Sequence, residues 1–239
     1  MQYFGGKARI AKELCKFLQG ELKEGQAFVD LFCGSCNVVS KIEADVRLAN
    51  DLHKELIAMW KSTQDGTFQP VRVSEEEYKL MRLDVNNETY PAWLRGFIGF
   101  GCSFSGKWWG GFAKCNRGDD YYMNALNSTN KKASKLQGVI FSQGSYKDVK
   151  GIPDNSLIYC DIPYKGTTAY SVGCFNHEEF YAWAVAMKRK GHNVLVSEYH
   201  TNVPEGWEVV YSIESKKDIR NKDGVQEKTI EVVMTPSLY

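Results

Sequence analysis

Two apolar segments, one that contains Asp30 and one that leads to Asp51, constrain the fold of this chain more than any other feature. Residues 27–32 (AFVDLF) predict a buried strand, and residues 46–49 (VRLA) predict a second strand that leads to Asp51. Between them lies a turn of small residues, 33–37 (CGSCN). A strand and a small-residue turn open a nucleotide-binding α/β fold, and an acidic residue about twenty positions after the first strand commonly holds ribose hydroxyls.

The rest of the chain alternates helical and strand patterns, which favours an α/β sheet. Asp30 and Asp51 could equally cap helices that follow them, because each is well suited to an N-cap. Helices are expected at residues 7–18, from 38–42, at 52–60, from Ser74, at 90–97 and at 177–190. Strands are expected at residues 139–141, 157–160 and 193–197, followed by an antiparallel pair at 207–213 and 229–234.

The segment with the most chemical information follows the strand predicted at residues 157–160 (LIYC). It consists of Asp161, Ile162, Pro163 and Tyr164. Ligands of open α/β sheets bind beyond the carboxyl ends of strands, so a reactive site is expected here. The acid and a main-chain carbonyl can accept hydrogen bonds from an amine, and Tyr164 can stack on a planar base. A strand that simply ends in an Asp-Pro type turn is the alternative, since short motifs often match by chance.

Two other regions have features that suit a ligand. Near the start, Gly5, Gly6 and Lys7 could bring the backbone and a cation close to an anion, although the same residues also make ordinary loops. Residues 99–114 are rich in glycine and aromatic residues and are too irregular for a strand or a helix. Residues 101–150 hold eight Lys or Arg against three Asp, which suits phosphate contact and base stacking. A solvated basic face with inward-packed tryptophans explains the pattern equally well.

Composition gives weaker constraints. A chain of 239 residues fits one large domain, or one domain that carries an inserted subdomain. Its 43% hydrophobic and 25% charged residues are ordinary for a soluble globular protein, and the net charge of +1 does not indicate a polyanionic partner. The sequence has neither a run long enough to span a membrane nor the apolar core of a signal peptide at its start, so a cytoplasmic location is expected.

The seven cysteines lack the regular spacing of a secreted disulfide framework, so free thiols are expected. Cys33 and Cys36 form a C-x-x-C pair, which could be a redox pair or half of a zinc site. The chain has no second pair at zinc-ligand spacing, and its four histidines are scattered. We therefore predict no metal site.

Taken together, these segments resemble the Dam-type DNA adenine methyltransferases, a family with phage-borne members, over nearly the whole chain. The family's Gly-Gly-Lys element looks like residues 3–7, and its donor strand and loop look like residues 28–35. Its ribose-binding acid corresponds to Asp51, and its Asp-Pro-Pro-Tyr motif to residues 161–164. The order of these elements also agrees with that of the family.

The resemblance implies a Rossmann-like methyltransferase sheet with helices on both faces and an inserted subdomain. Residues 1–65 would form the donor-binding first part of the catalytic domain, and residues 137–239 its second part. Residues 66–136 would form a mainly helical and loop subdomain that recognises the target.

The resemblance further implies that S-adenosylmethionine is the methyl donor, without a metal. The acceptor would be the N6 amino group of an adenine flipped out of double-stranded DNA, held by Asp161 and the Ile162 carbonyl within the motif that also contains Pro163 and Tyr164. The implied donor-binding residues are Tyr3, Lys7, Asp30, Phe32, Gly34, Ser35, Asp51 and Asp161. The candidates for DNA contact are Lys107, Trp108, Lys114 and Arg117.

This sequence departs from the family pattern at two positions. Cys36 replaces the second glycine of the donor loop, and cysteine resists a positive φ, so donor affinity could be reduced if that conformation is needed. Ile162 replaces the first proline of the catalytic motif, which keeps the carbonyl but loses the fixed φ of proline.

Three alternatives remain open from the sequence. The acceptor could be cytosine N4, adenine in RNA or a protein glutamine, although relatives with those substrates often begin the tetrapeptide with Ser or Asn. The chain could be a catalytically impaired DNA-binding relative, or a thiol oxidoreductase that uses Cys33 and Cys36. The DNA target sequence and the oligomeric state cannot be read from the sequence.

Overall fold

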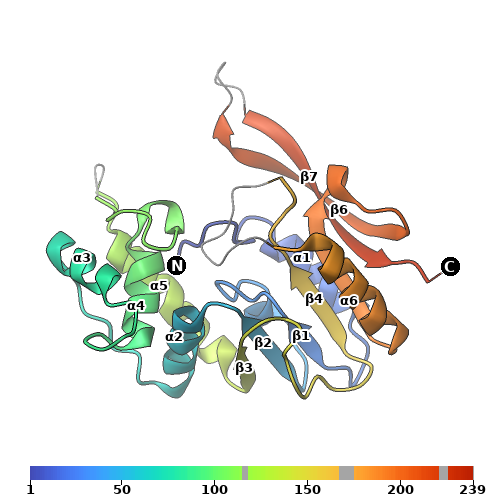
Figure 1. Ribbon diagram of the computed structural model, residues 1–239, viewed down its shortest axis with the longest axis horizontal. Coiled ribbons are helices and arrows are strands. Elements are labelled where there is room, and N and C mark those ends of the chain that lie inside the picture. The colour runs from blue at the N-terminus through green and yellow to red at the C-terminus, as the bar shows by residue number, and fades with distance from the viewer. Residues whose placement is uncertain (115–117, 167–174, 221–225, 239) are drawn as a thin grey trace.

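A seven-stranded sheet forms the centre of the protein (Figure 1). The computed structural model describes residues 1–114, 118–166, 175–220 and 226–238, and the side chains of these residues except 215–220 and 226–229. The strand order is β3-β2-β1-β4-β5-β7-β6. The strands are β1 (Phe28–Asp30), β2 (Arg47–Asp51), β3 (Val139–Gln143), β4 (Leu157–Asp161), β5 (Asn193–Tyr199), β6 (Trp207–Arg220) and β7 (Gln226–Pro236). This sheet confirms the expected α/β architecture.

The chain changes direction across the sheet between β1 and β4. From β1 it moves outward through β2 to β3, and after the helical segment it returns to pair β4 with the other edge of β1. These four strands and β5 are mutually parallel, whereas β7 runs antiparallel to both β5 and β6. Parallel strands end at the same edge of a sheet, so Asp30, Asp51 and Asp161 lie close together at the carboxyl ends of β1, β2 and β4. Ligands of such sheets bind at this edge, where the order of the strands reverses.

Helices cover both faces of the sheet, as expected. The helices are α1 (Ala11–Glu21), α2 (Lys54–Asp65), α3 (Glu75–Leu83), α4 (Ala92–Gly101), α5 (Tyr121–Ala133) and α6 (His177–Arg189). Alternate strand residues point to opposite faces, so Phe28 and Tyr159 join the cluster that contains α1. Val29 and Ile158 join the second cluster, which contains Phe180 and Ala184 of α6.

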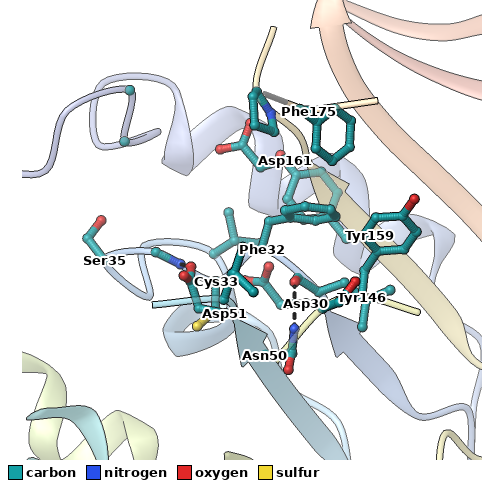
Figure 2. Close-up of a pocket in the computed structure, with 18 of the residues that line it drawn as sticks. Asp30, Phe32, Cys33, Ser35, Asn50, Asp51, Tyr146, Tyr159, Asp161 and Phe175 are labelled. Atoms are coloured by element: carbon teal, nitrogen blue, oxygen red, sulfur yellow. Dashed lines mark hydrogen bonds between the residues drawn. The ribbon is translucent and has the colours of Figure 1, made fainter. Parts of the chain in front are cut away.

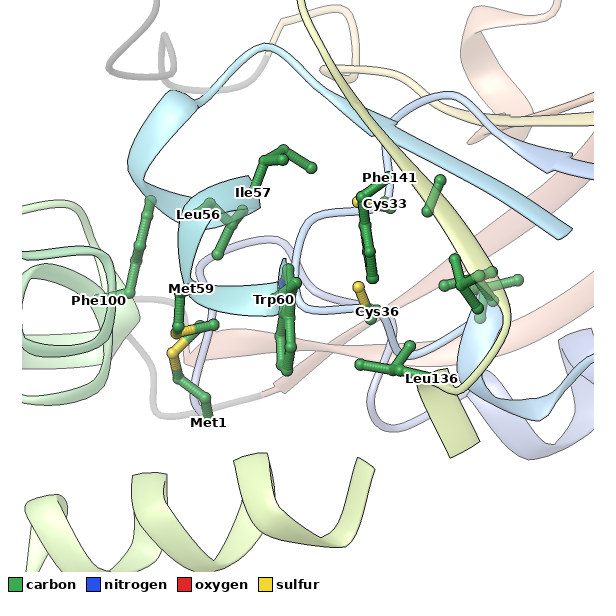
Figure 3. Close-up of a cluster of buried hydrophobic side chains, with 14 of the residues drawn as sticks. Met1, Cys33, Cys36, Leu56, Ile57, Met59, Trp60, Phe100, Leu136 and Phe141 are labelled. Carbon is green, nitrogen blue, oxygen red and sulfur yellow. The ribbon is translucent and has the colours of Figure 1, made fainter. Parts of the chain in front are cut away.

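The helices α3, α4 and α5 lie with α2 to one side of the sheet (Figure 1). The contact between α2 and α4 is close, because a Cβ built on Gly96 would lie 2.2 Å from the carbonyl oxygen of Glu55. Figure 3 shows fully buried Trp60 of α2 between Met59 on one side and Cys36 and Leu136 on the other. The helical segment and the sheet therefore share one core, and the predicted boundaries at residues 65 and 136 stay predictions.

The structure differs from the expected elements in three places. The helix expected from residues 38–42 is only the 3-10 turn η1 (Val39–Lys41), because Ile42 is already extended and the chain must enter β2 a few residues later. The irregular stretch 99–114 begins inside α4, and it then forms a second 3-10 turn, η2 (Phe104–Gly106). Helix α5 was not anticipated, since its sequence is polar along most of its length.

The helix predicted from Ser74 is confirmed, with a capping box between Ser74 and Glu77 at its start. Two further 3-10 turns are η3 (Ser134–Leu136) and η4 (His200–Asn202). Among the described residues, no helix combines the length and the apolar character needed to cross a membrane.

Candidate active site

A pocket opens at the carboxyl ends of β1, β2 and β4, and these strands bring Asp30, Asp51 and Asp161 to its wall (Figure 2). Its empty volume is about 1180 Å³, including space that is open to solvent. Of the residues predicted to bind the donor or to catalyse transfer, the following line it: Tyr3, Lys7, Asp30, Phe32, Gly34, Ser35, Asp51, Asp161 and Pro163. Segments that are far apart in the sequence thus share one cavity.

The turn after β1, residues 33–37, is held by hydrogen bonds on several sides. The Gly34 N–H donates to Asp51 Oδ2 at 2.9 Å, and the Cys33 N–H donates to the Asn50 carbonyl at 2.8 Å. From the opposite side, Trp60 Nε1 donates to the Gly34 carbonyl at 2.8 Å. Asp51 Oδ1 also accepts from the His53 N–H at 2.9 Å, so Asp51 both anchors this turn and supports the start of α2.

The turn at residues 33–37, called the donor loop here because the resemblance assigns it to donor binding, has a left-handed conformation at position 36. The family has a glycine at this position, and glycine favours that conformation. Cys36 has a φ of 54° and Gly34 a φ of 46°. A non-glycine residue in this region carries a strain of roughly 1–3 kcal/mol. The Cys36 side chain is fully buried, and both Cys33 and Cys36 are free thiols. Cys36 therefore adopts a left-handed conformation in this turn at a cost in strain.

Tyr3 packs between the N-terminal segment and the donor loop. A Cβ on Gly34 would lie 3.0 Å from Tyr3 Cε1, and a Cβ on Gly6 would lie 3.1 Å from the Tyr3 carbonyl oxygen and 3.3 Å from Ser35 Oγ. The Tyr3 ring also contacts Phe100 at 5.1 Å between centroids. The glycines that the sequence suggested for ligand approach thus also let these two segments meet around Tyr3.

Lys7 and Asp161 form a buried ion pair with a third partner. Lys7 Nζ lies 2.7 Å from Asp161 Oδ1 and 3.5 Å from Glu231 Oε2 of β7. Burial by itself would lower the pKa of Lys7, but the charges of Asp161 and Glu231 outweigh it and raise that pKa. Lys7 therefore carries a positive charge between the N-terminal segment, β4 and β7.

The three carboxylates at the strand ends differ in how readily they ionise. Burial raises the pKa of Asp161 to about 6, with Lys7 opposing the rise and Glu231 adding to it. Burial and the nearby charge of Asp161 raise the pKa of Asp30 to about 8, although backbone N–H groups of Val39 and Phe32 oppose the rise. Burial also raises the pKa of Asp51, against the hydrogen bonds that it accepts.

Two buried oxygens in or beside the pocket lack a hydrogen-bond partner in the structure. They are Asp30 Oδ1 and Asn50 Oδ1, while the Asn50 amide donates to the carbonyls of Leu31 and Gly144 at 3.2 and 3.0 Å. Unpaired buried acceptors are costly, so a ligand with donor groups would satisfy them. The polar residues present therefore fit a nucleoside that carries an ammonium group and hydroxyls. In the part of the chain that the structure describes, no cluster of three or more His, Cys, Asp or Glu side chains could hold a metal ion.

The remaining residues of the catalytic motif lie at the border of the pocket. The Ile162 side chain is buried in the α6 cluster, so its backbone is fixed by packing where the family has proline. The Tyr164 hydroxyl donates to Glu231 Oε2 at 3.0 Å, and Lys7 Nζ lies 4.3 Å from the centre of the Tyr164 ring. The Pro163 carbonyl contacts His177 Nε2 at 2.8 Å, which ties the motif to the start of α6.

The predicted DNA-contact residues are placed less uniformly. Lys107 is exposed with its Nζ 4.5 Å from the Phe4 ring centre, and Lys114 pairs with Glu75 at 2.7 Å. Trp108 packs on His53 at 4.2 Å and is half-buried, so inward packing accounts for much of this side chain. Arg117 lies outside the described residues, and the DNA role of all four residues stays a prediction.

Sequence reasoning did not single out several residues that line this pocket or support it. They are Asn50, Ser145, Tyr146, Lys147, Phe175, Asn176 and Glu179 in the pocket, and Glu231 beside Lys7. Tyr146 and Phe175 contact the Phe32 ring at 5.7 and 5.9 Å, which builds an aromatic wall. The signal for Ser145 and Tyr146 was their position just after a predicted strand, because β3 lies next to β2 and ends at the same edge.

Comparison with known proteins shows which enzymes the chain is similar to. Residues 3–91 match the model of the D12 class of N6 adenine-specific DNA methyltransferases. This part of the chain is similar to that family. The matched residues include Tyr3, Lys7, the turn at residues 33–37 and Asp51, but they stop before the predicted catalytic motif at residues 161–164.

The methyltransferase is also similar to characterised and solved proteins. It is 24% identical over 226 residues to the retron Ec67 DNA adenine methylase of Escherichia coli, covering 85% of this chain and 78% of that protein. A candidate RNA methyltransferase from Pyrococcus horikoshii is 11% identical, with a TM-score of 0.43, covering 95% of this chain and 84% of that one. Another candidate methyltransferase, SMU.472, solved with S-adenosylhomocysteine, is 10% identical, with a TM-score of 0.34, and covers 98% and 55% of the two chains.

Proposed function

We propose that this methyltransferase transfers a methyl group from S-adenosylmethionine to the N6 amino group of an adenine flipped out of double-stranded DNA. The observation that carries the proposal is the position of Asp161. Its carboxylate ends β4, lines the same pocket as Asp30 and Asp51, and lies 2.7 Å from Lys7 Nζ. An acceptor amine held by Asp161 would therefore meet a donor held by the other two acids.

The chain's own groups are suited to orient the donor. S-adenosylmethionine supplies an electrophilic methyl group on its sulfonium when it is bound. Asp30 Oδ1 and Asn50 Oδ1, which lack partners, would accept hydrogen bonds from it. Asp51 still has acceptor capacity for ribose hydroxyls, and the aromatic wall of Phe32, Tyr146 and Phe175 offers a surface for a base.

Asp161 and the Ile162 carbonyl would prepare the acceptor. The N6 lone pair of adenine is delocalised into the ring, so the nitrogen is a poor nucleophile. Hydrogen bonds from both amino protons favour a pyramidal nitrogen whose lone pair can attack the methyl group. The bond between sulfur and the methyl carbon would break, S-adenosylhomocysteine would leave, and the amino group would lose its extra proton along the hydrogen bond to Asp161. This requires an ionised Asp161, and the adjacent Lys7 charge favours that state against the cost of burial.

The base must leave the duplex to reach Asp161, because N6 is inaccessible in stacked and paired DNA. Tyr164, half-buried next to the pocket, would provide the stacking surface. Lys107, Trp108, Lys114 and Arg117 are the proposed DNA contacts. Basic residues of this kind would set affinity and register on phosphates.

The test is transfer of labelled methyl groups to unmethylated DNA, followed by nucleoside analysis of the product. N6-methyladenine is expected from the wild-type chain, and Asp161→Asn should lower the rate by at least about 100-fold, since it removes the acceptor charge at the reacting amine. Asp154→Asn is the matched control, because Asp154 is exposed in the segment just before β4. N4-methylcytosine as the product, or full activity in Asp161→Asn, would refute the proposed reaction.

A further inference from the structure

Lys132 is a buried cation that reaches from the helical segment to the donor loop. It lies in the last turn of α5, and only 8% of it is exposed. Its Nζ donates to the Ser35 carbonyl at 2.5 Å and to Asn37 Oδ1 at 2.8 Å. The preceding residue, Lys131, is exposed to solvent. The two neighbouring lysines thus have different environments, and only Lys132 contacts the loop in the structure.

We propose that Lys132 is a positioning residue that holds the donor loop in its binding conformation from helix α5. The inference rests on the proposed function, because it assigns loop residues 33–37 to donor binding. It assigns to the predicted target-recognition subdomain a contribution to donor affinity as well. The ligand concerned is the methionine end of the donor, which has a carboxylate and an ammonium group.

The first argument is the direction of the loop peptides. The Gly34 carbonyl accepts from Trp60 Nε1 at 2.8 Å, and the next carbonyl, that of Ser35, accepts from Lys132. In a planar trans peptide the N–H of the next residue points opposite to the carbonyl. Lys132 therefore sets the direction of the Cys36 N–H, which donates to the Cys33 carbonyl at 2.7 Å and closes the turn, while Trp60 turns the Ser35 N–H away from the core. Ser35 lines the pocket, so this N–H becomes available to a carboxylate.

The second argument is the strain in the same loop. Cys36, the residue after Ser35, has a φ of 54°, which is unfavourable for a side chain with a Cβ. Such a conformation persists only where the surrounding contacts hold it. Lys132 contacts the residues on both sides of Cys36, through the Ser35 carbonyl and the Asn37 side chain. Without these bonds the loop would relax toward an ordinary conformation.

The third argument is electrostatic. Lys132 binds two uncharged oxygens, and no carboxylate is paired with it among the described residues. Burial lowers the pKa of Lys132 to about 8, and the nearby Lys41 charge lowers it as well, against the Cys33 and Cys36 thiols. A buried cation without a counter-ion is costly, and a positive charge behind the loop favours an anion in front of it.

The experiment measures donor binding without DNA. S-adenosylhomocysteine, which retains the amino-acid end of the donor, is titrated by calorimetry into the wild-type chain and the variants Lys132→Met, Lys132→Gln and Lys131→Met. Losing a charge-assisted hydrogen bond pair should weaken binding about tenfold in Lys132→Met and less in Lys132→Gln. Lys131→Met keeps the buried contact and should bind as the wild type does.

A second readout reports on the loop itself without any ligand. The rate of Cys36 alkylation by iodoacetamide, followed by mass spectrometry, should rise in Lys132→Met, because the fully buried thiol becomes reachable when the loop relaxes. Thermal unfolding measured in parallel separates this effect from general destabilisation. If Lys132→Met fails to fold, the same two measurements on Lys132→Gln, which keeps a hydrogen-bond donor, test the role of Lys132.

The outcomes distinguish the two proposals. A folded Lys132→Met variant with wild-type affinity and wild-type Cys36 alkylation would overturn the role of Lys132 and leave the proposed function intact. Wild-type protein that does not bind S-adenosylhomocysteine would count against the proposed function and the inference together, while faster Cys36 alkylation alone would show that Lys132 holds the loop for another purpose.

Discussion

At the scale of single residues, the conformation of the donor loop depends on the lack of a side chain at Gly34. Gly34 combines a φ of 46° with a position where a Cβ would meet the Tyr3 ring. Cys36, two residues later, shows that a left-handed φ alone can be tolerated here. The contact with Tyr3 should therefore decide the effect of a substitution at Gly34.

We predict that Gly34→Ala weakens donor binding about tenfold or more, because the new methyl group must displace Tyr3 from the pocket wall. Gly25→Ala is the matched control. Gly25 has a φ of 70°, and a Cβ there would meet no atom within 4 Å, so it carries strain without a contact. Both variants should lose roughly 1 kcal/mol of stability from strain. Calorimetric titration with S-adenosylhomocysteine gives the answer, and equal affinities for the two variants would count against the role of Tyr3.

Residue-scale prediction from the sequence worked where a motif is local. Asp161 and Asp51 were identified because each follows an apolar strand, and the structure places both at the pocket. Glu231 was missed because its position beside Lys7 depends on β7 pairing with β5, a contact that links residues far apart in the chain. Similarly, the polar surroundings of Lys132 in α5 gave no sign that it is buried.

At the scale of elements, β7 adds a charge to the catalytic motif. Burial raises the pKa of Asp161, and the negative charge of Glu231 raises it further. Transfer requires ionised Asp161 in the proposed mechanism, so kcat/KM should rise with pH through the Asp161 pKa of about 6. The charge of Glu231 thus moves the acid limb of the pH–rate profile upward.

We predict that Glu231→Gln shifts this acid limb to lower pH, because removing the neighbouring negative charge lowers the pKa of Asp161. Glu208→Gln is the control, since Glu208 is an exposed glutamate on the adjacent strand β6. The measurement is kcat/KM for methyl transfer between about pH 5 and 8. An acid limb that stays in place, or that moves upward, would show that Glu231 does not act on Asp161 through its charge.

The elements themselves were largely predictable. Strands such as residues 157–160 and 193–197 are short apolar runs, and the fold buries them on both faces. The helix expected after residue 38 failed because local pattern cannot show how little chain remains before β2 begins. Helix α5 was not predicted for a different reason. Few of its side chains are buried, so its sequence shows little apolar periodicity.

At the scale of the whole molecule, helices α3, α4 and α5 meet the rest of the protein through the contact between α2 and α4. Gly96 allows this approach, because its Cα faces the Glu55 carbonyl with no room for a side chain. The interface also leads to Trp60 and from there to the Gly34 carbonyl. A substitution that alters the packing of α2 against α4 should therefore also alter the conformation of the donor loop.

We predict that Gly96→Ala destabilises the protein by roughly 1–3 kcal/mol or more, because the Cβ would lie 2.2 Å from a backbone oxygen. Gly20→Ala in α1 is the matched control: a Cβ there meets no atom within 4 Å, and alanine should stabilise the helix by about 0.5–1 kcal/mol. Urea unfolding of the variants measures both changes. Stabilisation by Gly96→Ala would mean that α2 and α4 do not pack this closely.

The position of β1 in the sheet has a consequence for how the chain is made. β1 pairs with β2 soon after both are synthesised, but its other edge waits for β4, more than a hundred residues later along the chain. Until the ribosome has released β4, the nascent chain holds an apolar strand edge with no hydrogen-bond partner from the sheet. Such an edge can pair with other chains, so truncated products that stop before residue 157 should be prone to aggregate.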